Sequence, residues 1–157
     1  MYLLDPSRIL LLIFLALAFL SACDSNNNSS VIDYSLAEQL IFNTDSVEST
    51  TTNTGLIIYE LEKGIGSITV VQRDIIQLFY TIRFKKTDNI IRSSYANNST
   101  IPATFTNLAS SSQFGDGFIE GVVGMKEKGK RVVIIPPKES IFTDTVIVDL
   151  NLDSIIF

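Results

Sequence analysis

The strongest strand signal in the chain is the run over residues 74–84, in which apolar and polar side chains alternate. Successive side chains of a strand point to opposite sides of a sheet, so residues of the same parity share a face. A strand with one apolar face is not stable alone, because other strands and a covering element must bury that face. The run therefore predicts a sheet with one face on a core and the other partly in water. The first face holds Ile76, Leu78, Tyr80, Ile82 and Phe84, and the second holds Gln77, Thr81 and Arg83.

One segment has convincing helical periodicity. Phe118, Val122 and Met125 recur at i, i+4 and i+7, which places them on one apolar stripe of a helix. We expect this helix to run over residues 117–128, with Asp116 as its N-cap. The stripe should form the centre of the core, because no other predicted helix can cover the sheet.

The rest of the sequence predicts short strands that pair with the first one. Runs over 56–62, 90–95, 104–108, 132–135 and 145–152 are rich in β-branched and aromatic residues and are bounded by turn residues. One helix on several antiparallel strands is an α+β fold. We expect an antiparallel sheet of about five strands curled around one short helix. Gly121 and Gly124 weaken the helix, and we expect them to let it approach the sheet closely.

The N-terminal segment resembles a secretory signal peptide that ends at a cysteine. Arg8 precedes an apolar run over residues 9–20, and the run leads into Leu20-Ser21-Ala22-Cys23. A membrane-spanning helix needs about 20 apolar residues, so this run is short for one. We expect cleavage before Cys23 and acylation of its thiol, as in a bacterial lipoprotein. The alternatives are a transmembrane anchor and a plain signal peptide with an incidental cysteine.

These signals divide the chain into three parts. Residues 1–22 are the predicted lipoprotein signal peptide. Residues 23–53 are a lipidated N-terminus and flexible tether, rich in Ser, Thr and Asn, with spacing that allows a short helix. Residues 54–157 are the predicted domain. We expect the protein in the bacterial cell envelope, lipid-anchored to a membrane with its domain in the periplasm. The choice between inner and outer membrane, and the face that carries the domain, stay open.

Composition excludes several kinds of chemistry. The chain has no histidine and one cysteine, so Ser-His-Asp and Cys-His catalysis, His/Cys zinc sites and structural disulfides are excluded. The net charge of −5 and the lack of a basic patch argue against nucleic-acid binding. We therefore expect no metal, no cofactor and no nucleic-acid partner.

Several motifs together resemble an FKBP-type peptidyl-prolyl cis-trans isomerase domain. The resemblance covers residues 54–152 approximately, and the stretch Glu120-Gly121-x-x-x-Met125-Lys126-x-x-Gly129-Lys130-Arg131 is its most specific part. The other matching motifs are Gly55-Leu56-Ile57-Ile58-Tyr59, Gly64-Ile65-Gly66, Asp74-x-Ile76-x-Leu78-x-Tyr80-Thr81, Phe118, Ile134-Ile135-Pro136-Pro137 and the closing strand from Val146 to Leu152.

The resemblance implies which residues form the site. Tyr80 and Phe118 fall on catalytic positions of the family, as a wall tyrosine and a pocket floor that is usually Trp. The ordinary alternative is that both rings are plain core. The implied substrate-binding set is Tyr80, Ile91, Phe105, Phe114, Phe118 and Val148.

The sequence departs from the family pattern at several of these positions. Ile91 replaces a wall phenylalanine, Arg92 a carboxylate, and Ala103 and Val148 replace aromatic residues, while Phe114 is a candidate replacement wall. The segment over residues 138–144 is short and lacks the tyrosine that caps the substrate in the family. The expected pocket is therefore shallow and more aliphatic.

The expected function is prolyl isomerisation that assists the folding of exported proteins, with weak activity because the pocket is degenerate. Its partners would be proline-containing unfolded or exported polypeptides, and the membrane through the lipid anchor. One alternative is a non-catalytic FKBP-fold lipoprotein that acts as a polypeptide-binding chaperone or a scaffold of an envelope complex. Another is an unrelated small β-rich envelope module.

Overall fold

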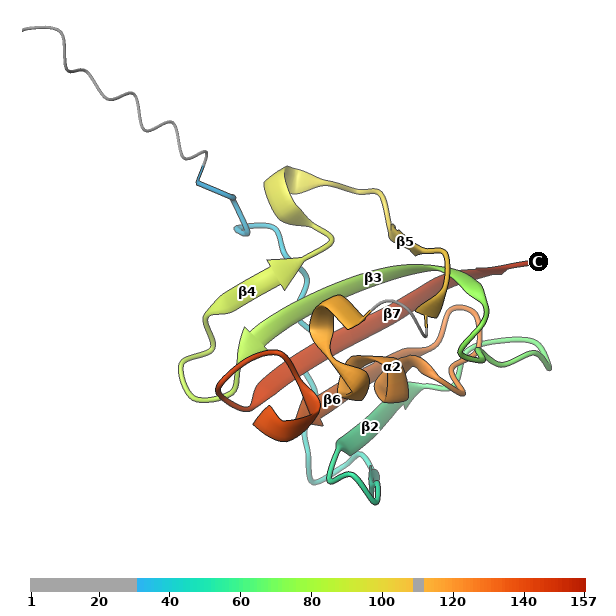
Figure 1. Ribbon diagram of the computed structural model, residues 1–157, viewed down its shortest axis with the longest axis horizontal. Helices are drawn as coiled ribbons and strands as arrows, with labels where there is room; N and C mark the ends of the chain where they lie inside the picture. Colours follow the sequence, from blue (N-terminus) through green and yellow to red (C-terminus); the bar gives the residue numbers. More distant parts are fainter. Residues whose placement is uncertain (1–30, 109–111) are drawn as a thin grey trace, which may run out of the picture. The chain divides into compact units, whose positions relative to one another are not determined.

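A computed structural model of the protein describes residues 31–108 and 112–157. The predicted signal peptide and Cys23 lie outside the described residues. The part of the chain from Ile32 to Phe157 forms one unit, built on an antiparallel sheet with a short helix, α2 (Asp116–Val122), on one face (Figure 1). No helix within the described ranges is long and apolar enough to cross a membrane.

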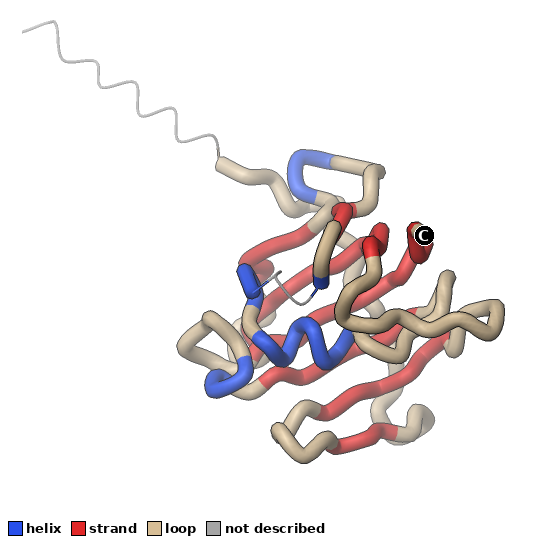
Figure 2. The backbone as a smooth tube through the Cα atoms, turned by 45° about the vertical axis from the view of Figure 1, so that its right-hand side comes forward, coloured by secondary structure: helices blue, strands red, loops and turns tan. Residues whose placement is uncertain are grey.

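The sheet has seven strands rather than the expected five, in the order β1-β2-β6-β7-β3-β4, with β5 also paired to β3. Figure 2 shows these strands side by side, with α2 lying across them. Six of the seven correspond to the strand runs identified in the sequence. The seventh is β1, whose polar sequence Ser-Thr-Thr carries no apolar alternation and therefore no strand signal. The bounds are β1 Ser49–Thr51, β2 Ile57–Glu62, β3 Ile75–Phe84, β4 Ile90–Ser93, β5 Ala103–Phe105, β6 Lys130–Ile135 and β7 Val146–Ile156.

The centre of the sheet is the long pair β3 and β7, which run antiparallel with Tyr80 opposite Leu150 and Phe84 opposite Val146. The free edge of β3 is shared, because its first half pairs with β5 and its second half pairs with β4. As the alternation predicted, Ile76, Leu78 and Ile82 are buried. We call this the inner face of the sheet, and it is the face that α2 covers.

The helix is shorter than predicted at its C-terminal end. It ends at Val122, because Val123 leaves the helical conformation and the Gly124 amide donates to the Val70 carbonyl at 2.9 Å. Asp116 lies in the first turn, and the N-cap is Gly115 with φ 91° and no side-chain cap. The expected N-cap was therefore wrong by one residue. The predicted core stripe is confirmed: Phe118, Val122 and Met125 are all buried, with Met125 past the helix end.

Gly121 brings the helix close to the sheet, as expected. A Cβ at Gly121 would lie 3.0 Å from a Val133 methyl group on β6, and one at Gly117 would lie 2.5 Å from Ile135 Cγ2. Gly124 has another role, because it lies beyond the helix with φ 81°, a conformation that favours glycine.

The segment predicted as a flexible tether differs from the expectation over its second half. Residues 33–42, which we call the strap, cross the face opposite to α2, the outer face, and β1 follows. The short helix allowed for by the sequence is absent, since the described residues before β1 are coil and turns. The reason is tertiary: the strap makes its hydrogen bonds to the sheet and to the loop after β4. The Asn97 amide donates to the Asp33 carbonyl at 2.7 Å, and the Thr81 hydroxyl donates to the Glu38 carbonyl at 2.7 Å.

Three further short turns of 3-10 helix complete the described elements. They are η1 Ala96–Asn98, η3 Ser112–Phe114 and η4 Pro137–Glu139. Of these, η3 matters most for the site, because it leads directly into α2.

Candidate functional site

Four aromatic rings from four different elements meet between the inner face and the helix. Tyr80 comes from β3, Phe105 from β5, Phe114 from η3 and Phe118 from α2. Every pair among them is in ring contact. The centroid distances are 4.9 Å for Phe114–Phe118, 5.2 Å for Tyr80–Phe114, 5.6 Å for Phe105–Phe118, 5.8 Å for Tyr80–Phe118, 6.1 Å for Tyr80–Phe105 and 6.5 Å for Phe105–Phe114. The structure thus brings together four of the six residues predicted to bind substrate.

The four rings differ in exposure. Phe118 is 1% exposed, Phe105 3% and Phe114 5%, whereas Tyr80 is half-buried. Phe114 was expected as a candidate replacement wall of the pocket, and its ring is buried in the cluster against Phe118 and Tyr80. The surface that the cluster offers to solvent therefore belongs mainly to the side of Tyr80.

The other two predicted binding residues lie at different depths. Val148 is 1% exposed and belongs to the core on β7, opposite Ile82 on β3. Ile91 on β4 is half-buried and packs against the same core. Its carbonyl accepts a hydrogen bond of 3.3 Å from the Tyr34 hydroxyl, so a residue of the strap reaches this strand.

Burial raises the pKa of Tyr80, and the nearby Tyr34 hydroxyl acts in the same direction, while Arg92 opposes it. The ordinary pKa of a tyrosine is already near 10. The Tyr80 phenol therefore stays protonated at neutral pH and can donate a hydrogen bond.

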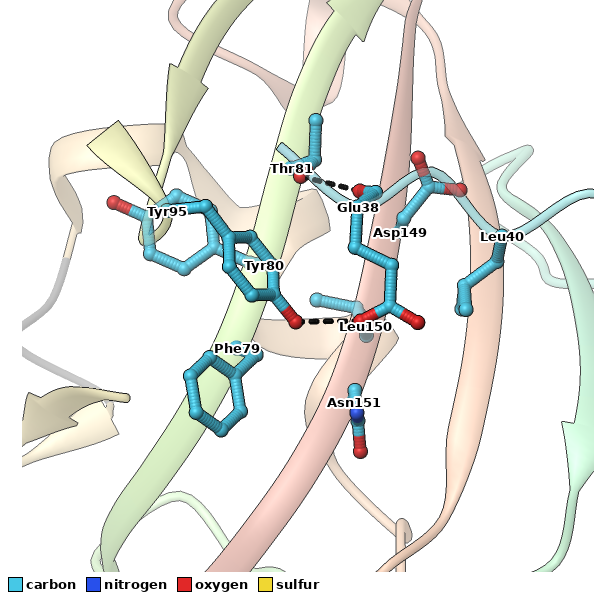
Figure 3. A pocket seen from close by; sticks show the side chains of 9 residues that line it. All are labelled: Glu38, Leu40, Phe79, Tyr80, Thr81, Tyr95, Asp149, Leu150 and Asn151. Atoms are coloured by element: carbon cyan, nitrogen blue, oxygen red, sulfur yellow. Dashed lines mark hydrogen bonds between the residues drawn. The ribbon is translucent and has the colours of Figure 1, made fainter. Parts of the chain in front are cut away.

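A polar network on the outer face holds the backbone behind Tyr80 (Figure 3). Thr81, next to Tyr80, is completely buried, although its side of the strand was predicted to be partly wet. Its hydroxyl donates to the Glu38 carbonyl and lies 3.1 Å from Ser93 Oγ. The Tyr95 hydroxyl donates to the Glu38 carboxylate at 2.7 Å. Nothing in the sequence signalled these contacts, because Glu38 lies far from Thr81 along the chain and in a segment that was predicted to be a flexible tether with a possible short helix.

The same face buries an ion pair. The Arg83 Nε lies 3.2 Å from Asp149 Oδ2, and the Asp149 side chain is 3% exposed. Burial raises the pKa of Asp149, although hydrogen bonds from Arg83 and from the Leu40 backbone amide oppose the shift. A cavity of about 10 Å³ lies between the strap and these residues. It has room for one water molecule at most, so it is a packing gap and not a ligand site.

A larger cavity of about 440 Å³ lies outside the aromatic cluster, on the other side of α2. Asp116, Glu120 and Glu139 line it together with Ile119. Within residues 31–108 and 112–157, however, no group of three or more His, Cys, Asp or Glu residues is placed to bind a metal ion.

A protein-family model for FKBP-type peptidyl-prolyl cis-trans isomerases matches residues 66–142. The chain carries an FKBP-type domain. The matched range includes Tyr80, Ile91, Phe105, Phe114 and Phe118, and it ends before Val148. An unrelated β-rich module, one of the alternatives that the sequence left open, is thereby excluded.

Solved structures share this fold. FkpA from Escherichia coli is 22% identical with a TM-score of 0.59, over 68% of this chain and 51% of that one. The N-terminal domain of FKBP42 from Arabidopsis thaliana is 13% identical with a TM-score of 0.64, over 76% and 100%. A peptidyl-prolyl cis-trans isomerase from Pseudomonas syringae is 18% identical with a TM-score of 0.57, over 69% and 81%.

These likenesses concern the fold alone. The chain spans about half the length of FkpA, and no sequence among curated proteins matches it significantly. What the FKBP-type domain of this chain acts on therefore has to be argued from its own site.

Proposed function

We propose that the protein is a lipid-anchored FKBP-type prolyl isomerase that assists the folding of exported proteins. The observation that carries this proposal is the meeting of Tyr80 and Phe118. Their rings lie edge to face, with centroids 5.8 Å apart and an interplanar angle of 81°, inside the range matched by the FKBP-type family model.

The chemistry of such a site needs no acid, base or metal. Rotation about a peptide bond has a barrier of about 18–20 kcal/mol, because the planar amide is stabilised by resonance. The twisted amide has less charge separation, so apolar surroundings favour it over the planar form, and a donor such as the Tyr80 hydroxyl adds a hydrogen bond. A chain without histidine has all the groups that this mechanism requires.

The N-terminal sequence supports the proposed location of the protein, in the cell envelope. The apolar run before Leu20-Ser21-Ala22-Cys23 is typical of a signal peptide with a cysteine at its cleavage site. An acylated Cys23 would hold the domain in the envelope, where proline-containing exported polypeptides pass in an unfolded state.

A refolding assay tests the activity. The full chain, purified in mild detergent, is added to a model protein whose refolding is limited by prolyl isomerisation, a step that takes tens of seconds or more when uncatalysed. We expect acceleration that rises in proportion to the concentration of the chain. Refolding at the uncatalysed rate with micromolar protein would refute the isomerase proposal.

One observation favours a second candidate, a non-catalytic FKBP-fold protein that binds polypeptides or scaffolds an envelope complex. Phe118 is 1% exposed, so the expected floor of the pocket is covered in this structure. Suppression of aggregation of an unfolded polypeptide, without acceleration of prolyl-limited refolding, would support this candidate over the first.

A further inference from the structure

Phe118 is 1% exposed, and two further phenylalanines contact both rings of the Tyr80–Phe118 pair. Phe114 lies 5.2 Å from Tyr80 and 4.9 Å from Phe118, between ring centroids. Phe105 lies 6.1 Å and 5.6 Å from the same two rings. A prolyl ring that is to contact both Tyr80 and Phe118 must therefore take the place of one of these two phenylalanines.

Phe105 is poorly suited to move. It belongs to β5, which pairs with β3 in register, and Phe105 itself lies opposite Ile76. Moving its ring out of the core would disturb a strand pair that also forms the edge of the sheet.

Phe114 is better placed to move, because it lies on the three-residue turn η3 and not in a strand. The residue after it is held firmly: Gly115 has φ 91°, and a Cβ there would lie 2.7 Å from Ser140 Cα. The backbone at Gly115 thus packs closely on residues 139 and 140, and a rotation of the Phe114 side chain about its own χ angles requires no shift of α2.

We propose that Phe114 is an internal occupant of the aromatic site and competes with the prolyl ring of a substrate. This inference rests on the proposed function, because it takes Tyr80 and Phe118 as the surfaces that contact the substrate. Polypeptide binding then requires the Phe114 ring to leave the cluster, and Phe114 determines how readily the site opens.

The competition has a measurable consequence. If the open form is a minor state of about 1–10%, the apparent affinity for a proline peptide is reduced about 10- to 100-fold. A smaller side chain at position 114 removes this competition. It also removes ring contacts that stabilise the fold, so binding and stability should change in opposite directions.

The test compares Phe114→Val and Phe114→Leu with the wild type, as full chains in mild detergent. The probe is a labelled peptide with one central proline, and the same peptide with alanine in its place reports non-specific binding. The matched control is Phe79→Val, which removes a ring from the outer face of the same strand as Tyr80, where Phe79 stacks on Tyr95. Peptide binding is followed by fluorescence anisotropy, cis–trans exchange by NMR, and stability by urea unfolding.

We expect Phe114→Val to bind the proline peptide about 10- to 100-fold more tightly, Phe114→Leu to lie between it and the wild type, and Phe79→Val to leave the affinity unchanged. Unchanged or weaker binding by folded Phe114→Val and Phe114→Leu would overturn the inference. A wild type that catalyses exchange while the Phe114 variants gain nothing would leave the proposed function intact. A wild type without catalysis, together with variants that bind the proline peptide, would support the inference and refute the proposed activity of the wild-type protein.

Discussion

At the scale of single residues, Tyr80 is fixed through its backbone as well as through its ring. Its amide donates to Ser94 Oγ at 2.9 Å, and its carbonyl accepts from the Ser94 amide at 2.9 Å and from Ser93 Oγ at 3.1 Å. These bonds tie β3 to the end of β4 directly beside the aromatic cluster. The position of the phenol therefore does not depend on its own hydroxyl group.

Tyr80→Phe should thus remove a hydrogen-bond donor and leave the ring in place. If the hydroxyl stabilises the twisted amide with a hydrogen bond of about 0.5–1.5 kcal/mol, the isomerisation rate falls about 2- to 10-fold. The free energy of unfolding should change by less than about 1 kcal/mol, since ring packing is kept. NMR exchange on a proline peptide and urea unfolding measure the two effects.

Tyr59→Phe is the control for this prediction, because Tyr59 lies on β2 with its ring against Phe42 of the strap. It should leave the rate unchanged. Full activity of Tyr80→Phe would mean that its hydroxyl has no part in the reaction.

At the scale of elements, the helix and the strap hold the sheet from opposite faces. The helix needs glycine where it meets the sheet, and this is clearest at its first turn. A Cβ at Gly117 would lie 2.5 Å from Ile135 Cγ2 and 2.8 Å from the Glu139 carbonyl oxygen. A backbone oxygen cannot turn away as a side chain can, so the whole helix would have to shift.

We expect Gly117→Ala to destabilise the domain by about 1–3 kcal/mol, a typical cost of overpacking, despite the gain of about 1 kcal/mol in helix propensity. Gly121→Ala is the matched comparison, because the atoms nearest to its Cβ would belong to the side chain of Val133, with the methyl groups at 3.0 Å and 3.3 Å. It should cost less than Gly117→Ala in urea unfolding. The reverse order would show that the helix does not approach the sheet as described.

A separate prediction concerns Thr81, whose hydroxyl holds the strap to the sheet. Thr81→Val keeps the shape of the side chain but removes the donor to the Glu38 carbonyl and the contact with Ser93 Oγ. Because buried acceptors are left without a partner, the free energy of unfolding should fall by about 1–3 kcal/mol. Hydrogen exchange over residues 33–42 should become faster at the same time.

Thr104→Val is the control for Thr81→Val, since Thr104 is an exposed threonine on β5. It should change stability by no more than about 0.5 kcal/mol. Unaltered exchange over residues 33–42 in Thr81→Val would mean that the strap is held by other contacts, such as the pairing of Asp33 with Asn97.

At the scale of the whole molecule, the strap joins the outer face of the sheet to the loop after β4. The described structure fixes Asp33 to the loop after β4, and Tyr34 reaches Ile91 near the aromatic cluster. Within the described residues, the N-terminal end of the strap therefore lies close to Ile91, one of the predicted binding residues.

Cys23→Ser tests the anchor in a bacterial host. We expect the wild-type chain to incorporate labelled palmitate and to sediment with membranes, and Cys23→Ser to lose the label. Loss of residues 1–22 from the wild-type chain, checked by mass spectrometry, would distinguish a cleaved lipoprotein from an uncleaved transmembrane segment. Label on Cys23→Ser would show that another residue is acylated.

The sequence alone determined which side chains face the core, because strand and helix periodicity are local properties. Ile76, Leu78 and Ile82 are buried as their alternation predicted, and the stripe that begins at Phe118 is the centre of the core. The FKBP-type motifs identified the fold, and the four aromatic residues implied by the resemblance do meet in space.

The tertiary structure decided what depends on residues far apart in the chain. The helix ends at Val122 because Gly124 pairs with Val70, and Thr81 is buried because Glu38 lies on it. The burial of Phe114 was decided in the same way, by the rings of Tyr80 and Phe118 that pack against it. The spacing of apolar residues along the sequence does not predict such pairs, because each pair depends on which surfaces the folded chain brings into contact.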